Sequence, residues 1–196
     1  MWDDRYASDE YLFGTEPNDF LKASAAKLPP GRILCLADGE GRNGVYLAEQ
    51  GYDVTSIDGS AVALAKARRL ADARGVTLTT HQADLFDYDP GEACWDGIVI
   101  IFFHMPPDKR RQVHALVERA LVPGGVLVHE AYTPEQLNFR TGGPPVAEFL
   151  QTVSILRQDF PGLVFEHALE LERDVVEGKG HFGRASVVQL IARKPA

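Results

Sequence analysis

The sequence contains little cysteine and no long apolar run. Only two of its 196 residues are cysteines, Cys35 and Cys94, and both fall in segments predicted to be core strands. Two buried thiols on separate strands indicate neither a disulfide framework nor a metal site. A reducing, cytoplasmic location is therefore the default expectation. No apolar stretch approaches the roughly 20 residues that span a bilayer, and the N-terminus lacks a signal-peptide pattern, so we expect no membrane partner.

Positive charge is also scarce. The chain has 20 Lys and Arg against 28 Asp and Glu, a formal net charge of −8. Binding to nucleic acid needs a positive surface, so we expect no nucleic-acid partner. The histidines show no ligand spacing, and we propose no metal. The length predicts one domain over residues 1–196, and the oligomeric state stays open.

The segment from Arg32 to Asp58 is the most informative stretch. Residues 32–36 form a short apolar run typical of a buried parallel strand. A glycine-rich turn follows, then helical spacing that stops at Gly51, then a second strand that ends at Asp58. This pattern predicts a β-turn-α-β unit of the size found in nucleotide-binding folds.

The turn of this unit suits a ligand. Gly39 and Gly41 have no Cβ, so a ligand can lie against the backbone, and the following helix directs free N–H groups toward it. Asp58 lies nineteen positions after Gly39, where its carboxylate can accept hydrogen bonds from both ribose hydroxyls. We therefore predict an adenosine-containing cofactor. A tight turn without a ligand is the alternative.

The strand–helix alternation continues. Ser60 is expected to cap a helix through Arg74, and a strand over 76–82 leads to Asp84, placed either to accept a hydrogen bond from an exocyclic amine such as that of adenine or to cap a turn. Further segments are a central strand over 94–103, a helix capped by Asp108 that runs to Leu121, and a strand over 126–131. The pattern predicts a doubly wound α/β fold with a mostly parallel sheet.

The two ends of the chain frame this core, which we place at residues 31–131. Residues 1–28 form an aromatic arm, either a lid over the cofactor or a packing arm. Residues 132–145 read as a substrate-facing flap. Over 146–196 we expect a helix at 146–159 and two strands, 163–176 and 185–193, that pair as an antiparallel hairpin.

With these pieces in place, the chain resembles the class I S-adenosylmethionine-dependent methyltransferases over nearly its full length. Their first motif, acid-x-Gly-x-Gly-x-Gly, aligns with Cys35-x-Ala37-x-Gly39-x-Gly41, and Leu121-Val122-Pro123-Gly124-Gly125 resembles the turn before their fifth strand. Gly39-Glu40-Gly41-Arg42-Asn43 and Tyr11-x-Phe13-Gly14-x-x-Pro17-Asn18 are similar to the tellurite-resistance and thiopurine-type branch, whose members methylate small, soft nucleophiles.

The resemblance implies a fold, a cofactor and a site. The fold is a Rossmann-like, seven-stranded sheet with a terminal antiparallel hairpin, and the cofactor is S-adenosyl-L-methionine. The expected cofactor-binding residues are Ala37, Asp38, Gly39, Gly41, Arg42, Asn43, Asp58, Gly59, Ser60, Ala83, Asp84, Leu85 and Phe102. The acceptor is expected to be a small molecule.

Two positions depart from the family pattern. Cys35 replaces the acid that orders the loop, and Ala37 replaces the first glycine, although Asp38 or Glu40 could supply a carboxylate nearby. Both departures bear on how tightly the cofactor binds.

For catalysis we expect His104 as a base or positioning group, because it follows the fourth strand. A histidine that only caps the next helix or lines the pocket is the alternative. Tyr11 and Phe13 of the arm and Tyr132 and Arg140 at the flap are expected near the substrate. A nicotinamide-dependent oxidoreductase and a non-catalytic regulatory protein that binds S-adenosylmethionine remain alternative functions.

Overall fold

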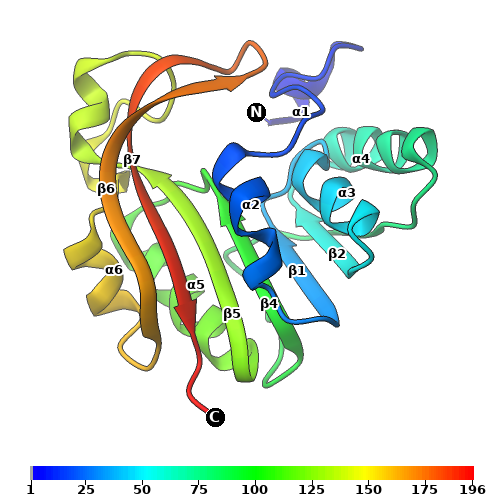
Figure 1. Ribbon diagram of the computed structural model, residues 1–196. Helices are drawn as coiled ribbons and strands as arrows, with labels where there is room; N and C mark the ends of the chain where they lie inside the picture. The colour runs from blue at the N-terminus through cyan, green and yellow to red at the C-terminus, as the bar shows by residue number, and fades with distance from the viewer. Residues whose placement is uncertain (1) are drawn as a thin grey trace.

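A computed structural model describes residues 2–196, so the first residue of the predicted arm lies outside the described residues. The chain forms one seven-stranded sheet in the order β3-β2-β1-β4-β5-β7-β6, with helices on both faces (Figure 1). The strands are β1 (Arg32–Leu36), β2 (Asp53–Asp58), β3 (Thr79–Gln82), β4 (Trp95–Ile101), β5 (Leu121–Tyr132), β6 (Val164–Glu177) and β7 (His181–Arg193). The α-helices are α1 (Trp2–Tyr6), α2 (Asp19–Ser24), α3 (Arg42–Glu49), α4 (Ala61–Arg74), α5 (Pro107–Ala120) and α6 (Val153–Asp159).

The sheet is parallel except for β7. Strand β1 pairs in parallel with β2 on one side and with β4 on the other, so the strand order reverses between β1 and β4. Strand β7 runs antiparallel to both β5 and β6. The predicted fold class, including the terminal hairpin, is confirmed. In an open parallel sheet, ligands bind beyond the carboxyl ends of the strands where the order reverses.

Each face of the sheet has its own core. Leu34 and Leu36 of β1 point into a buried cluster with α5 and α6, whereas Ile33 and Cys35 point into a second cluster that includes residues of α2 and α3. This alternation follows from the two-residue period of a strand. In Figure 1, α2 crosses in front of the sheet and α5 lies behind it. Burial raises the pKa of the Cys35 thiol well above its usual range, as expected for an inert core cysteine.

Several predicted boundaries shift. Strand β3 begins at Thr79 instead of residue 76, and β7 begins at His181 instead of residue 185. The helix expected over 146–159 is confined to α6, preceded by a 3₁₀ turn at Ala147–Phe149. Gln151 donates its backbone N–H to the carbonyl of Tyr132, at 2.9 Å, which draws the intervening chain against the sheet.

One predicted helix cap is wrong. Asp108 lies in the first turn of α5, and Pro106 occupies the N-cap position without a side-chain hydrogen bond. The helix instead begins at Pro107, because the fixed φ of proline already suits the first helical position. Among residues 2–196, none of the helices combines the length and apolar character that crossing a bilayer requires.

A buried ion pair fixes the N-terminal arm. The Lys66 ammonium on α4 pairs with Glu40 of the glycine-rich turn, and both side chains are almost completely buried. The same ammonium donates to the carbonyls of Ser8 at 2.9 Å and Glu10 at 2.7 Å, while Glu40 accepts the backbone N–H of Leu12 at 2.8 Å. The pair therefore joins the arm to α4 and to the turn after β1.

We expect Lys66→Met to lower the free energy of unfolding by about 3–5 kcal/mol, because it leaves the buried Glu40 carboxylate without a counterion. Residues 6–13 should also lose protection from amide exchange. Denaturant unfolding and hydrogen exchange measure the two effects. Arg69→Met, on the exposed side of the same helix, is the matched control. Equal stability of the two variants would contradict a structural role for the pair, and Lys66→Met/Glu40→Gln should recover part of the loss.

A second expectation concerns the backbone at Ala37, which follows β1 directly. Its φ is +54°, in the left-handed region that costs a residue with a Cβ about 1–2 kcal/mol. Ala37→Gly should therefore raise the free energy of unfolding by about 0.5–1 kcal/mol, after the greater entropy of the unfolded glycine chain is subtracted. Ala65→Gly, in the exposed middle of α4, should instead lower it by about 1 kcal/mol. Thermal unfolding compares the two, and destabilisation by both would disprove strain at Ala37.

Candidate functional site

A cavity of about 1050 Å³ opens beyond the carboxyl ends of β1, β2 and β4, where the strand order reverses. The predicted site residues on its wall are Phe13, Ala37, Asp38, Gly39, Arg42, Asn43, Asp58, Gly59, Ser60, Ala83, Asp84, Leu85, Phe102 and His104. The cavity has the size of a pocket for a cofactor and a small second molecule.

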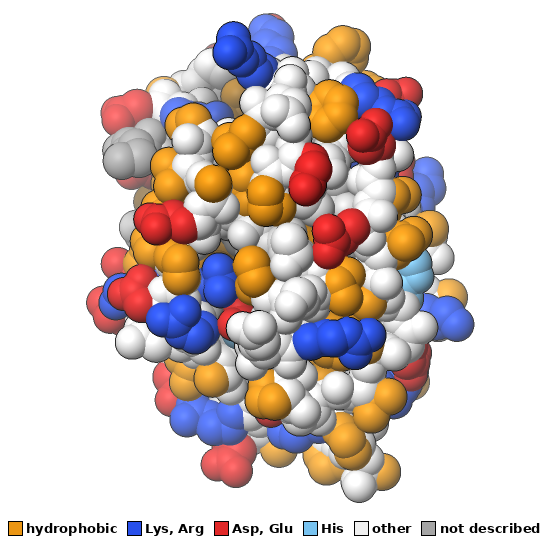
Figure 2. Space-filling model, turned by 90° about the vertical axis from the view of Figure 1, so that its left-hand side faces the viewer, with side chains coloured by type: hydrophobic (Ala, Val, Ile, Leu, Met, Phe, Trp, Pro, Cys, Tyr) orange, Lys and Arg blue, Asp and Glu red, His pale blue; other side chains and the backbone are white. Residues whose placement is uncertain are grey.

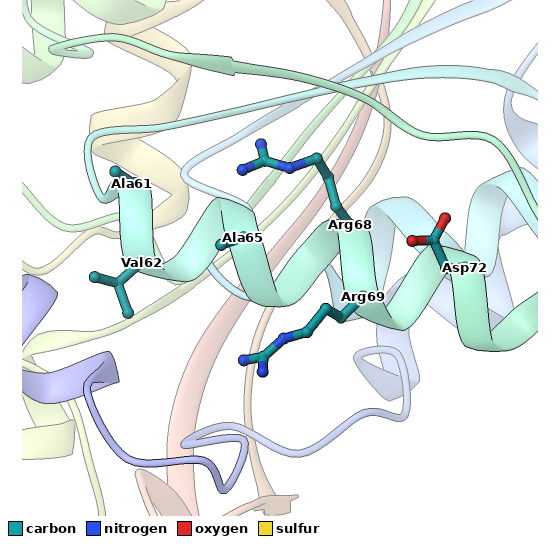
Figure 3. A pocket seen from close by; sticks show the side chains of 6 residues that line it. All are labelled: Ala61, Val62, Ala65, Arg68, Arg69 and Asp72. Atoms are coloured by element: carbon teal, nitrogen blue, oxygen red, sulfur yellow. The ribbon is translucent and has the colours of Figure 1, made fainter.

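A second hollow lies on the outer surface of α4. All six residues that line it belong to that helix, as Figure 3 shows. Arg68 and Arg69 diverge from each other there, so no polar groups from different elements converge on a common point. This hollow lacks the architecture of a site, and the functional candidate is the cavity at the strand ends.

The glycines of the turn have different tasks. Gly39 lines the cavity, and a Cβ there would lie 2.9 Å from the Tyr6 hydroxyl. Gly41, at φ +85°, does not line it, since a Cβ at this position would lie 2.5 Å from the Cβ of Ala67 on α4. The absence of a Cβ at Gly39 thus lets Tyr6 approach the turn at the cavity wall, and Gly41 allows α3 and α4 to pack closely.

Asp58 ends β2 with its carboxylate at the cavity wall. One oxygen accepts the Gly39 N–H and the other accepts the Ser60 N–H, both at 2.9 Å. A carboxylate has about four acceptor sites, so two remain for a ligand. Burial raises its pKa, and the two backbone N–H groups oppose that effect. The side chain is fixed in position before any ligand arrives.

Asp38 and Glu40 have internal partners. The Asp38 carboxylate accepts the Ser56 hydroxyl at 2.6 Å and the Gly44 N–H at 3.2 Å, and burial raises its pKa to about 7. It therefore orders the turn from inside, next to the position where Cys35 replaces the family acid. Glu40 holds the arm through Lys66. Of the two carboxylates considered as substitutes for the family acid, Asp38 is therefore the one that bonds within the turn.

Asp84 follows β3 at the same edge. One of its oxygens accepts the backbone N–H of Phe86 at 2.9 Å, which closes a turn, while the exposed carboxylate also lines the cavity. The two interpretations of this residue, turn cap and ligand acceptor, are therefore compatible.

Aromatic rings form the opposite wall. Phe102, which has φ +54°, stacks on Tyr132 with ring centroids 4.4 Å apart. The His181 ring contacts Phe102 at 4.9 Å and Phe13 at 4.6 Å. The left-handed backbone at Phe102 turns the chain out of β4 and places its ring at the cavity.

His104 is half-buried at the cavity wall, and both of its ring nitrogens have partners. Its Nε2 accepts the backbone N–H of Tyr132 at 2.9 Å, and its ring stacks on that tyrosine. Burial and the nearby His181 lower the pKa of His104 from 6.5 to about 3, although a hydrogen bond with the Phe102 backbone opposes the change. This imidazole is neutral at pH 7 and has no free lone pair, an arrangement that suits a positioning group better than a base.

Three other predicted substrate residues lie away from the cavity. Tyr11 donates its hydroxyl to the carbonyl of Lys66 and packs on α4. Tyr132 is fully buried under the flap, because a Cβ at Gly142 would lie 2.9 Å from its hydroxyl. Arg140 is exposed, with φ +57°. Tyr132 therefore supports the wall from behind, and the other two do not face the cavity.

The structure adds wall residues that the sequence reasoning missed. These are chiefly Asp3 and Arg5 from α1, Phe149 after the flap, and Gly180 and His181 from the hairpin, whereas Trp2 and Tyr6 belong to the aromatic arm that the sequence analysis identified. The helical i, i+4 spacing of Trp2 and Tyr6, whose ring centroids lie 5.6 Å apart, could have predicted α1 from the sequence. His181 had no local signal, because only the register of β6 and β7 brings it to the site.

No group of three or more His, Cys, Asp or Glu suited to a metal ion occurs within residues 2–196.

Comparison with known proteins gives a consistent result. The model of the family described as "Methyltransferase domain" matches residues 33–125, which contain the turn, Asp58 and Asp84. A glycine/sarcosine N-methyltransferase of Halorhodospira halochloris is 36% identical over 132 residues, which cover 65% of this chain and 46% of that protein. The chain spans about half the length of the first curated relatives that it matches.

Solved structures share the fold at low sequence identity. One, from work on the conversion of a disulfide bond into a thioacetal group during echinomycin biosynthesis, has a TM-score of 0.81 at 21% identity and covers 99% of this chain and 90% of its own. TehB of Haemophilus influenzae has a TM-score of 0.71 at 20% identity, covering 98% of this chain and 65% of its own. Sequence match, strand order and cavity position agree: residues 33–125 match the methyltransferase-domain family, and the chain has the fold of the class I S-adenosylmethionine-dependent methyltransferases.

Proposed function

We propose that this chain transfers a methyl group from S-adenosylmethionine to a small-molecule acceptor held in the same cavity. The observation that carries the proposal is the juxtaposition of two unlike walls. On one wall stand the glycine turn, Asp58 and Asp84, and on the other an aromatic cluster that includes Phe13 and Phe102. The first suits an adenosine with an amino-acid tail, and the second suits a cation and an apolar acceptor.

The residues present fit the cofactor. Gly39 presents bare backbone to the cavity, and Asp58 keeps acceptor sites for a ribose. Asp84 offers its second oxygen to an exocyclic amine. S-adenosylmethionine, when bound, supplies a methyl group on a positively charged sulfur. The protein's part is to align the acceptor, exclude water and, where the acceptor requires it, remove a proton.

We propose further that the arm and the flap act together as a lid. Trp2 and Tyr6 of α1 line the cavity from one side, and Gly142 to Pro145 line it from the other. Lys66 and Glu40 hold the arm, and α1 itself rests on α4, because the Tyr6 carbonyl accepts from Lys66 at 3.4 Å and Asp3 bonds the Ser60 hydroxyl. Lid opening would therefore require these contacts to break. A closed lid would keep water from the reacting centre.

A small acceptor also agrees with the surface. The face of the molecule on the hairpin side shows acidic, basic and apolar side chains interspersed, without a continuous basic area (Figure 2). The cavity volume of about 1050 Å³ leaves limited space beside a cofactor. These features favour a small acceptor, including the soft nucleophiles expected from the sequence, over a nucleic acid.

We expect Asp58→Ala to weaken the binding of S-adenosylhomocysteine by about 1.5–3 kcal/mol, the scale of a lost charge-assisted hydrogen bond. Isothermal titration calorimetry measures this change. Asp53→Ala, at the exposed opposite end of β2, is the matched control and should bind normally. Unchanged affinity in Asp58→Ala would remove the ribose assignment.

Calorimetric titration with two ligands also distinguishes the proposed function from the oxidoreductase alternative. S-adenosylhomocysteine should bind and NAD should not, whereas the reverse would favour a nicotinamide-dependent oxidoreductase. Turnover of radiolabelled S-adenosylmethionine with panels of thiols, amines and oxyanions then distinguishes an enzyme from a regulatory protein that only binds the cofactor.

A further inference from the structure

His181 is the first residue of β7 and faces the cavity from the turn of the terminal hairpin. Its ring lies between Phe13 and Phe102, and the flap covers it, since a Cβ at Gly142 would lie 2.7 Å from its Cδ2 atom. The ring is thus held on three sides by the arm, the end of β4 and the flap, next to the aromatic part of the cavity.

One nitrogen of this ring has a fixed partner. His181 Nδ1 lies 3.3 Å from an oxygen of Glu177, the residue opposite it in the β6–β7 register. The Glu177 carboxylate is itself fixed by Arg42 at 2.7 Å and by the Asn18 amide at 2.8 Å. Two independent donors therefore orient the carboxylate, and the carboxylate orients the ring.

The second nitrogen is available. A carboxylate accepts hydrogen bonds, so Nδ1 carries the proton and Nε2 keeps a lone pair. Among residues 2–196, the one side-chain hydrogen bond that the ring makes is through Nδ1, and none involves Nε2. In His104, by contrast, the equivalent lone pair is taken by a backbone N–H. Of the two histidines on the cavity wall, only His181 can accept a proton without breaking an existing contact.

We propose that His181, oriented by Glu177, is the general base of this site, and that the acceptor is a neutral amine, hydroxyl or thiol that must lose a proton. This inference rests on the proposed methyl transfer and adds to it the base and the acceptor class. The acceptor's X–H bond breaks and its electron pair forms the bond to the methyl carbon. The carbon–sulfur bond of the donor breaks with its electrons left on sulfur, while the proton passes to Nε2 and then to solvent.

The surrounding charges suit this role. Burial lowers the pKa of His181, Glu177 acts to raise it, and Arg42 of α3 and Arg5 of α1 act to lower it further. The other titratable groups packed on the ring are His104, which is neutral, and the buried Tyr132. Burial opposes the ionisation of Glu177, but Arg42 and His181 hold its pKa at about 2, so the carboxylate is charged and can stabilise an imidazolium.

The first test needs no known acceptor. In ¹⁵N-correlated spectra of the protein saturated with S-adenosylhomocysteine, His181 should show the Nδ1–H tautomer and a pKa below 6.5, assigned by its absence in His181→Gln. Glu177→Gln should remove the tautomer preference. An Nε2–H tautomer, or a doubly protonated ring at pH 7, would overturn the proposal.

The second test is turnover with glycine, 2-mercaptoethanol and catechol as protic acceptors and benzoate as an acceptor without a proton to lose. On a protic acceptor, His181→Gln should lower kcat about 100-fold or more, with little change in KM or in the affinity for S-adenosylhomocysteine. Rate should fall as the pH decreases through the pKa of His181. Because Glu177 raises that pKa, Glu177→Gln should shift this acidic limb to lower pH while it lowers kcat.

His81→Gln, on the exposed strand β3, is the matched histidine control and should keep full activity. Wild-type kcat in His181→Gln on a protic acceptor would overturn the proposed base while leaving the methyltransferase function intact. Faster turnover of benzoate than of the protic acceptors would overturn the proposed acceptor class and leave the methyltransferase function intact. If the wild-type protein did not bind S-adenosylhomocysteine, that result would instead contradict the proposed function itself.

Discussion

The ion pair between Arg42 and Glu177 joins the parts of the molecule that enclose the cavity. Arg42 begins α3 and Glu177 ends β6, so the pair connects the cofactor turn to the terminal hairpin across 135 positions of sequence. Both side chains are less than 10% exposed, and a buried charge without a partner is costly. The side-chain amide of Asn18, in the N-terminal arm, donates to the same Glu177 carboxylate and also to the fully buried Glu130 of β5. The arm, the turn and the hairpin are thereby held in one arrangement.

This arrangement produces a cavity with two chemically different sides. The carboxylates of the cofactor side are held mainly by backbone N–H groups, as Gly39 and Ser60 hold Asp58, so their positions depend on the turn and not on mobile side chains. The other side is built from rings that stack on one another, as Phe102 does on Tyr132. Fixed acceptors suit the recognition of hydroxyls and amines, and a dry aromatic wall suits a reaction that water would disturb.

The departures from the family motif are compensated locally. Cys35 cannot order the turn, but Asp38 bonds the Ser56 hydroxyl and the Gly44 N–H from within. Ala37 keeps the left-handed backbone that a glycine would adopt freely, and the surrounding strands β1 and β2 hold it there despite the strain. Burial of Asp38 raises its pKa to about 7, so the interior of this turn changes charge near neutral pH.

The sequence by itself determined the sheet, the turn and the part of the cavity wall that carries Asp58 and Asp84. Apolar runs, helix stops such as Gly75 and acids at strand ends are local signals, because they arise within a few residues of one another. Only the tertiary structure decided the aromatic wall of the cavity. His181 reaches the cavity through the register of β6 and β7, whereas Arg140, which has φ +57°, does not line it. Whether a histidine keeps a free lone pair, as His181 does and His104 does not, depends on contacts with distant segments, and no spacing in the chain encodes them.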